Sequence, residues 1–225
     1  MNKLDGVCYR GATIKDVYFI VDAIVEAEKS GTDRLSYSAI FGLTEEEVRR
    51  YLAIMLSEEI DGCGELSISN YLLAEKGNQL IAASCAWVEG AEGMPTAVLK
   101  GNLLIFSLPE KVIERTIRLQ KIFHELHFDY KNGAAFMGAG YVVKEFRGNN
   151  LLMILKDKQL NYFRTNPDIS EAYVDTFSCS KAALRTNEKL GFQVLRIKES
   201  NTTEILNYLP SNKKLLLRKV LEKHL

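Results

Sequence analysis

A strand, a short charged loop and a helix follow one another around Tyr141–Leu155, and no other stretch restricts the fold as strongly. Residues 134–143 form an apolar run with two glycines, and a segment of helical length begins at Leu151. At such a junction, unpaired N–H groups and the positive end of the helix dipole point to one place. The sequence therefore predicts an anion site, with a phosphate-bearing molecule as its ligand.

Hydrophobic periodicity and turn signals divide the first part of the chain into two helices and a hairpin. Thr13 and Thr44 are each followed three residues later by an acid, the capping-box pattern that begins a helix. Gly77-Asn78 links two apolar runs and favours a two-residue hairpin turn. The expected elements are a strand at 7–10, a helix from 14 to about 29, a loop at 32–43, a helix from 45 that ends before Gly62, and antiparallel strands at 71–76 and 79–88.

The second part of the chain alternates strands and helices after one long connection. That connection, residues 90–133, predicts its own helix, which begins near Pro109 and ends before Gly133. The order of elements predicts a mixed α/β fold with helices packed on a central sheet. The remaining expected elements are strands at 134–143, 171–177, 192–198 and 214–220 and helices at 151–163 and 180–190.

Charge and cysteine content exclude several classes of function. The 29 basic and 29 acidic residues give a formal net charge of zero, so no overall field draws the chain to nucleic acid or to an anionic membrane. The four cysteines form no C-x-x-C pair and no metal-binding spacing, and we expect no metal. No segment approaches the roughly 18 consecutive apolar residues of a spanning helix. We therefore expect a soluble protein of the cytoplasm.

Two motifs are shared with a known family of enzymes. Val142, Arg147 and Gly148 are similar to a V-x-P-x-x-R-G-x-G-x-G/A loop, and residues 188–192 read E-K-L-G-F. Both resemble the GCN5-related N-acetyltransferases, and the order of elements across residues 7–220 agrees with that fold. The resemblance implies a mixed α/β fold with a mostly antiparallel central sheet, a splayed central strand and flanking helices. It also implies a single acyl-CoA N-acyltransferase domain over residues 1–225, with an inserted helical segment at about 90–133.

The same resemblance implies acetyl-CoA, or another acyl-CoA, as a cosubstrate. In the family, N–H groups of the loop and helix hold the pyrophosphate, and a bulge in the central strand makes room for the pantetheine arm. Gly138 and Gly140 are consistent with such a bulge, or with packing against a helix. Ser180 stands where relatives often place an Asn that contacts pantetheine, and it is also the expected N-cap of its helix. The residues expected to bind the cosubstrate are Val142, Val143, Arg147, Gly148, Asn149, Asn150, Leu151, Leu152, Ser180 and Asn187.

The chain departs from the family pattern at several positions. Lys144 replaces the loop proline, and Asn150 and Leu152 replace its second and third glycines. Asn tolerates positive φ better than other non-glycine residues, and Leu152 fits if it lies inside the helix with an ordinary φ. Many relatives have a tyrosine, proposed to protonate the departing thiolate, where this chain has Asn187. An Asn amide forms hydrogen bonds but cannot act as an acid at neutral pH.

Transfer of an acyl group to an amine requires a base, because an ammonium has no lone pair to attack a thioester. Likeness to arylalkylamine-type members places an acid near the end of the first helix, where the negative end of the dipole raises a carboxyl pKa. Glu26 and Glu28 lie there, with the alternative role of solvated charges. His124, three residues before His127, is another base near pH 7, or one half of a packing pair. The catalytic candidates are Glu28, Glu26, His124, Asn187 and Tyr141, with Glu65 and Glu89 as further acids.

These features favour an N-acyltransferase that moves an acyl group, most simply acetyl, from acyl-CoA to a small amine by direct attack. The alternative is a catalytically silent coenzyme A-binding sensor or interaction module, which Asn187 and the altered glycines motivate. We expect a small-molecule amine as the acceptor, no nucleic-acid or membrane partner, and a homodimer contact or a lid formed by the inserted helix.

Overall fold

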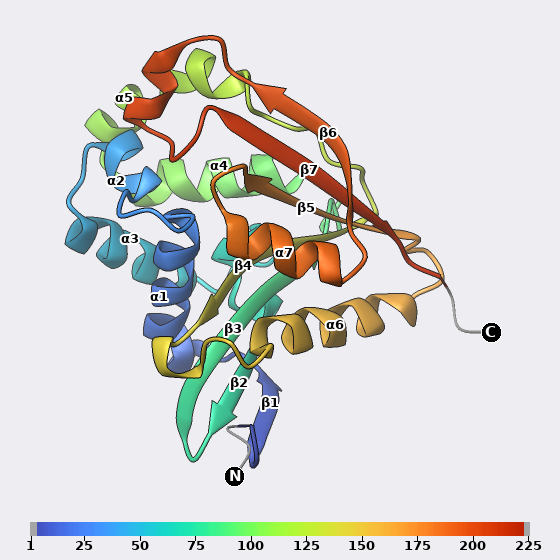
Figure 1. Ribbon diagram of the computed structural model, residues 1–225. Helices are drawn as coiled ribbons and strands as arrows, with labels where there is room; N and C mark the ends of the chain where they lie inside the picture. Colours follow the sequence, from blue (N-terminus) through green and yellow to red (C-terminus); the bar gives the residue numbers. More distant parts are fainter. Residues whose placement is uncertain (1–3, 223–225) are drawn as a thin grey trace.

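Seven strands form one sheet with helices on both faces in the computed structural model, which describes residues 4–222 (Figure 1). The strand order is β1-β2-β3-β4-β5-β7-β6, and every neighbouring pair is antiparallel except β4 and β5. The expected mixed, mostly antiparallel sheet is therefore confirmed. The strands are β1 (Val7–Gly11), β2 (Tyr71–Lys76), β3 (Gln79–Val88), β4 (Ala135–Val142), β5 (Glu171–Phe177), β6 (Gln193–Glu199) and β7 (Lys213–Val220).

The parallel strands β4 and β5 are paired only at one end, which splays the sheet at its centre. Ala135 is paired with Ala172 and Phe136 with Tyr173, and within the described residues no further pair follows. On its other side, β4 stays paired with β3 as far as Val142. The expected splayed central strand is confirmed, and the second half of β4 has one free edge.

A bulge in β4 lies close to the point where the two strands separate. Ser84 of β3 is paired with Gly140, whereas Ala86 is paired with Met137. Two residues of β4 therefore lie opposite Cys85 alone, which is the arrangement of a β-bulge. The bulge that the sequence predicted here is confirmed.

The two glycines of β4 also allow close contacts that a side chain would prevent. A Cβ atom at Gly138 would lie 2.6 Å from the ring of Trp87, and one at Gly140 would lie 2.7 Å from the side chain of Leu152. Leu152 belongs to the helix that follows the loop. The glycines thus let this helix and β3 approach the strand from both sides.

Helices cover both faces of the sheet, so a hydrophobic core lies on each face. Cys85 packs with residues of α1 (Val17–Glu28) and α3 (Glu45–Ser57), while its neighbour Ala86 packs with residues of α6 (Leu151–Arg164). Figure 1 shows α6 and α7 (Lys181–Lys189) next to each other in front of the sheet. Successive strand residues point to opposite faces, so one strand contributes to both cores.

A pair of hydrogen bonds fixes α6 to the sheet. The hydroxyl of Ser84 donates to Oε1 of Gln159 at 2.7 Å, and Nε2 of Gln159 donates back to the Ser84 carbonyl at 2.9 Å. Both side chains are buried. The rotation of α6 about its axis is therefore set by a polar contact as well as by packing.

The connection between β3 and β4 carries two helices, α4 (Thr96–Ser107) and α5 (Glu110–His124), where the sequence predicted only the second. A second correction concerns α2 (Ser36–Phe41), which lies inside the predicted loop. Neither α2 nor α4 has a side-chain N-cap. In α4 the apolar residues also lie on opposite sides, since Leu103 is buried and Ile105, two residues later, is exposed, so no clear helical stripe marks it.

The capping box of α3 gives a test of local stability. The hydroxyl of Thr44 accepts from the Glu47 amide at 3.2 Å, and the Glu47 carboxylate accepts from the Thr44 amide at 2.9 Å. We expect Thr44→Ala to lower the free energy of unfolding by about 1 kcal/mol, because an N–H of the first turn loses its acceptor. Denaturant unfolding measures this, with Thr44→Ser as the control that keeps the hydroxyl. Equal stability of the two variants would contradict the prediction.

Candidate functional site

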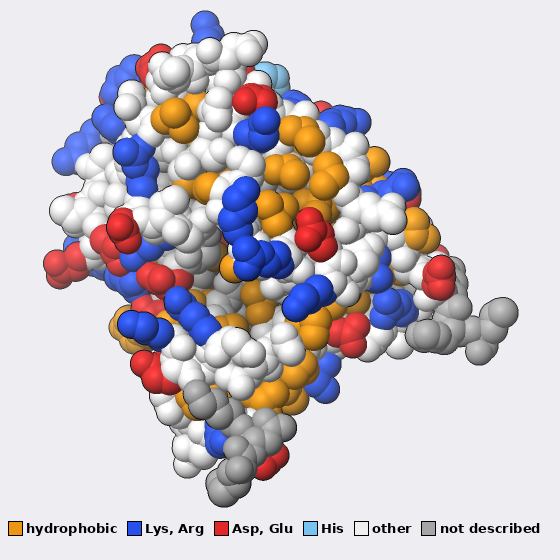
Figure 2. Space-filling model, viewed as in Figure 1, with side chains coloured by type: hydrophobic (Ala, Val, Ile, Leu, Met, Phe, Trp, Pro, Cys, Tyr) orange, Lys and Arg blue, Asp and Glu red, His pale blue; other side chains and the backbone are white. Residues whose placement is uncertain are grey.

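A cleft of about 620 Å³ lies where β4 and β5 separate. Its walls come from the C-terminal end of α1, the free half of β4, β5, the start of α4, α6 and α7. Figure 2 shows Lys and Arg side chains around the middle of the face that α6 and α7 cover. Twelve of the residues singled out from the sequence line the cleft: Glu26, Glu28, Glu65, Glu89, Gly138, Gly140, Tyr141, Val142, Arg147, Leu152, Ser180 and Asn187.

The loop between β4 and α6 presents a row of free backbone donors at one end of the cleft. Gly148 has φ +82° and Asn150 has φ +60°, so both take the left-handed conformation that turns successive amides toward one side. In the described chain, the N–H groups from Gly148 to Met153 donate to no protein acceptor. Leu152 lies inside α6, as expected. This end of the cleft is therefore suited to an anion.

Two side chains hold the loop in this shape. The amide of Asn149 donates to the carbonyl of Phe146 at 3.0 Å and to that of Arg147 at 3.2 Å. Nε of Arg147 donates to the carbonyl of Val142 at 3.0 Å, and the rest of this guanidinium is exposed beside the cleft. The loop thus adds a positive charge to its free N–H groups.

The free edge of β4 supplies hydrogen-bonding groups deeper in the cleft. The amide of Val143 donates to the Ile81 carbonyl of the neighbouring chain segment at 2.9 Å. Because alternate residues of a strand direct their backbone groups to opposite edges, the amides of Val142 and Gly140 face the splay. The pairing with β5 has ended before this point. An extended molecule with amide groups fits along this edge.

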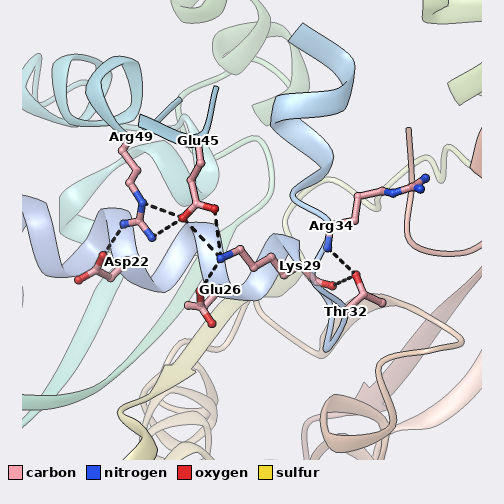
Figure 3. Close-up of polar contacts among 7 residues, drawn as sticks. All are labelled: Asp22, Glu26, Lys29, Thr32, Arg34, Glu45 and Arg49. Carbon is pink, nitrogen blue, oxygen red and sulfur yellow. Dashed lines mark hydrogen bonds and ion pairs between the residues drawn. The ribbon is translucent and has the colours of Figure 1, made fainter. Parts of the chain in front are cut away.

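Glu28 and Glu26, which the sequence left equivalent, have different surroundings. Glu26 forms an ion pair with Lys29 at 2.9 Å, within a surface network that continues through Glu45 to Arg49 (Figure 3). The carboxylate of Glu28 lines the cleft and has no hydrogen bond or ion pair within residues 4–222. The structure therefore separates two acids of the cleft wall, Glu26 with an ion-pair partner and Glu28 without one in the described chain.

The pKa of Glu28 is raised to about 7, chiefly by burial. The half-buried side chain opens onto the cleft, yet protein surrounds its carboxyl closely enough to disfavour the charged form. Lys100 and Lys214 act in the opposite direction, while Glu65 and Asp175 add to the shift. A carboxyl group that is half ionised near neutral pH is suited to accept a proton.

The other carboxylates of the cleft already have partners. Glu65 pairs with Lys100, and Asp175 pairs with Lys214 at 2.6 Å. Glu89 accepts from the Trp87 ring nitrogen at 3.2 Å and from the amide of Thr96 at 2.9 Å. Burial raises the pKa of Glu65, but Lys100 outweighs this and leaves the pKa below its usual value. Glu26 is paired with Lys29, so Glu28 alone among the five carboxylates of the cleft has no partner in the described chain.

A buried lysine at the cleft was missed from the sequence. Nζ of Lys156 on α6 donates to Oδ1 of Asn187 on α7 at 3.0 Å, and both side chains line the cleft. They are 4% and 1% exposed, and no carboxylate of the described chain pairs with Lys156. Burial lowers the pKa of Lys156 to about 8. Its position one turn after Leu152, on the buried face of α6, was the signal available in the sequence.

The remaining predicted residues have mixed placements. Tyr141 lines the cleft and packs edge-on against Phe19, with ring centroids 5.8 Å apart. Ser180 occupies the N-cap position of α7, but its hydroxyl donates to the Ser30 carbonyl at 3.2 Å and caps no amide of the helix. The capping role predicted for this side chain is therefore wrong, and the bond instead joins α7 to the end of α1.

The two histidines lie away from the cleft. His124 is at the exposed end of α5, its ring stacked near that of His127 with centroids 6.3 Å apart, and neither lines the cleft wall. Across residues 4–222, no group of three or more His, Cys, Asp or Glu side chains is arranged to hold a metal ion. Within the same range, no helix combines the length and apolar content needed to cross a bilayer.

The fold is shared with solved acetyltransferase structures at low sequence identity. An N-acetyltransferase from Staphylococcus aureus Mu50 matches with a TM-score of 0.67 at 14% identity, covering 94% of this chain and 100% of that one. A GNAT-family acetyltransferase from Streptococcus pneumoniae matches with a TM-score of 0.53 at 13% identity, covering 96% and 99%. RimL, a ribosomal alpha-N-protein acetyltransferase in complex with coenzyme A, matches with a TM-score of 0.56 at 11% identity, covering 98% and 97%. No protein-family model and no curated protein matches the sequence.

Proposed function

Because the chain has the fold of the GCN5-related N-acetyltransferases, we propose that it transfers an acyl group, most simply acetyl, from acyl-CoA to a small amine. The proposal rests on the groups that line one cleft. The free edge of β4 and the unpaired carboxylate of Glu28 line it, and Arg147 and Leu152 of the lining flank the loop that carries the free amides. These are the groups that bind phosphate, pair with an amide-containing arm and accept a proton.

The residues present fit coenzyme A. The loop amides from Gly148 to Leu152 and the exposed guanidinium of Arg147 suit its pyrophosphate. The free amides of Gly140 and Val142 suit the amide groups of its pantetheine arm and the carbonyl of the acyl group. Bound acyl-CoA supplies the activated acyl group, and an N–H aimed at the thioester carbonyl stabilises the negative charge that develops there.

Glu28 is the proposed general base. An amine arrives at neutral pH mostly as an ammonium, and a carboxylate of pKa about 7 accepts one of its protons. Lys100, Glu65 and Asp175 stand around it, and their ion pairs keep their own charges fixed. Glu26 and His124 are set aside as bases, the first because Lys29 pairs with it and the second because it lies outside the cleft.

The cleft favours a small amine over a protein chain as the acceptor. Thr96 and Lys100 of α4 line it, so the segment between β3 and β4 forms part of its wall, which supports a lid role for that segment. The unpaired carboxylate of Glu28 favours a cationic group beside it. A ribosomal protein acetyltransferase is among the similar structures. A test must therefore compare small amines with the N-terminal amine of a peptide as the acceptor.

Binding and turnover test this proposal separately. Isothermal titration of the purified protein is expected to show coenzyme A binding in the micromolar range, and release of free thiol from acetyl-CoA is expected with at least one member of a panel of small amines. Peptides with free N-termini serve as the comparison panel. No detectable coenzyme A binding would refute the proposal. Binding without thiol release across both panels would instead favour a silent coenzyme A sensor.

A further inference from the structure

We propose that Lys156, held by Asn187, is the group that gives a proton to the sulfur leaving the acyl carbon. This proposal rests on the acyl transfer proposed above and assigns a residue to its second half. The position that holds a tyrosine in many similar enzymes is Asn187 here, and an amide has no proton to give at neutral pH. The structure places an ammonium directly against that amide.

The stability of the fold does not explain why Lys156 is buried. An ammonium that is 96% buried normally has a carboxylate as a partner, whereas the only hydrogen-bond acceptor of Lys156 among residues 4–222 is the neutral Oδ1 of Asn187 at 3.0 Å. The one titratable group close enough to act on it within the described residues is the thiol of Cys85 on β3. Burial raises the pKa of that thiol, so it is neutral as well. A buried charge kept without a counter-charge suits a site where negative charge develops during a reaction.

The pair presents hydrogen-bond donors to the cleft. One proton of Nζ is used by Asn187, which leaves two, and Nδ2 of Asn187 is buried without any partner within residues 4–222. Four N–H protons on two nitrogens are therefore left without an acceptor among the described residues at this part of the cleft wall. A thiolate is the acceptor that acyl transfer produces.

The position of α6 places these donors next to the gap between β4 and β5. Leu152 lies against Gly140 on the free edge of β4, and Lys156 follows one helical turn later on the same side of α6. The Gln159–Ser84 hydrogen bonds fix the rotation of the helix, and α7 brings Asn187 from the other side. Lys156 is thus set beyond the loop, at the depth of the free strand edge rather than at the phosphate end.

The proposed step balances in atoms and charge. Glu28 first takes the ammonium proton of the amine and releases it to water in the open cleft. The neutral amine nitrogen then bonds to the acyl carbon, and Glu28 takes a second proton from it. The carbon–sulfur bond then breaks with its electron pair going to sulfur, and Nζ of Lys156 transfers a proton to the sulfur, which leaves as a thiol. Lys156 is then neutral and Glu28 protonated, and exchange with water in the open cleft restores both.

The lowered pKa of Lys156, about 8, suits this role and predicts a pH dependence. The group gives a proton only while it is protonated, so kcat is expected to fall as pH rises through about 8. The ordinary lysine value near 10.4 would hold the proton too tightly for efficient transfer at neutral pH.

Lys156→Met tests the assignment, because methionine keeps the length of the side chain and removes the ammonium. We expect kcat with acetyl-CoA to fall about 10²-fold or more while KM for acetyl-CoA changes less than about threefold, and the fall of kcat above pH 8 to disappear. Lys158→Met is the matched control: it lies on the same helix, exposed, with Nζ over the ring of Tyr9, and it is expected to behave as the unmodified protein. The methionine variant should fold, since it replaces an unpaired buried charge by an apolar group.

Two further measurements distinguish proton donation from a packing role. Ultraviolet titration of the thiolate of bound coenzyme A needs no turnover, and the bound thiol is expected to ionise at a pH at least one unit higher in Lys156→Met than in the unmodified protein. Asn187→Asp places a carboxylate against Nζ, so it is expected to move the fall of kcat to higher pH. A merely structural side chain would produce neither shift.

The outcomes separate this inference from the proposed function. If the unmodified protein neither binds coenzyme A nor releases thiol, the proposed function fails. If it does both, and Lys156→Met keeps its kcat, its pH profile and the ionisation of bound thiol, then the assignment of Lys156 is overturned while the acyltransferase stands.

Discussion

Glu28→Gln is expected to lower kcat/KM for the amine by roughly 10²- to 10⁴-fold, the usual contribution of a positioned general base. Glutamine has nearly the same shape and cannot accept the proton of the attacking amine. The ionised form of Glu28 is the active one, so the activity of the unmodified protein is expected to rise as pH increases through about 7. This rise should be absent in the variant. Steady-state rates from pH 5.5 to 8 with a saturating acyl donor measure both effects.

Glu26→Gln is the control for that experiment. Glu26 stands on the same helix, two residues earlier, but pairs with Lys29 at the surface (Figure 3). We expect it to keep nearly full activity and the same pH profile. Equal losses in both variants would show that the end of α1 matters only as a structure, and would remove Glu28 from the mechanism.

Stability provides a second check on Glu28 that does not depend on activity. Its folded-state pKa, about 7, lies above its ordinary value of 4.5, so the folded protein binds more protons than the unfolded chain between these two values. Stability from this group is therefore full below about pH 4.5 and is lost as pH rises through 7. Glu28→Gln is expected to remove that part of the pH dependence.

Gly148→Trp is expected to abolish detectable binding of coenzyme A. The residue has φ +82°, and no atom lies within 4 Å of where its Cβ would be, so the indole would occupy the open space in front of the loop amides. A phosphate needs that space to reach them. Isothermal titration with coenzyme A measures the loss, which we expect to exceed about 100-fold in Kd, equal to about 2.7 kcal/mol.

Gly133→Trp provides a control with the same strain. Gly133 has φ +77° and also has no atom within 4 Å of a built Cβ, but it precedes β4 at the end of the strand away from the loop. It is expected to keep its affinity for coenzyme A. Loss of binding in both variants would mean that a strained backbone, and not the blocked phosphate site, explains the result.

Local signals were sufficient for much of the fold. Gly77 and Asn78 both have positive φ, as a tight hairpin turn requires, and Thr44 forms the capping box that its sequence predicts. Gly191 takes a left-handed conformation with φ +84° after α7, as expected. These features depend on neighbours within a few residues. In contrast, α4 has weak segregation of its apolar residues, so only tertiary contacts define it.

In the candidate site, too, some features follow from local sequence and others only from tertiary contacts. The anion loop is contiguous, so the sequence was enough to single out Gly148 and Asn150. The distinction between Glu26 and Glu28 depends on the ion pair of Glu26 with Lys29 and on the burial of Glu28 by other elements of the fold. The contact between Lys156 and Asn187 spans two helices, and nothing local reveals that no carboxylate accompanies the lysine. Burial and absent partners are properties of the folded chain.

Because β4 and β5 are paired over only a short length, binding of a ligand between them is coupled to folding. Two residue pairs are all that join the half-sheet β1–β4 to the half-sheet β5–β6–β7 through backbone ladders in the described chain. A molecule lying along the free edge of β4 acts as an additional strand and completes the interrupted ladder. It binds only the assembled halves, so it stabilises the native state by mass action, in proportion to the logarithm of its concentration above Kd. The supply of the proposed acyl donor would then raise the free energy of unfolding as well as the rate of turnover.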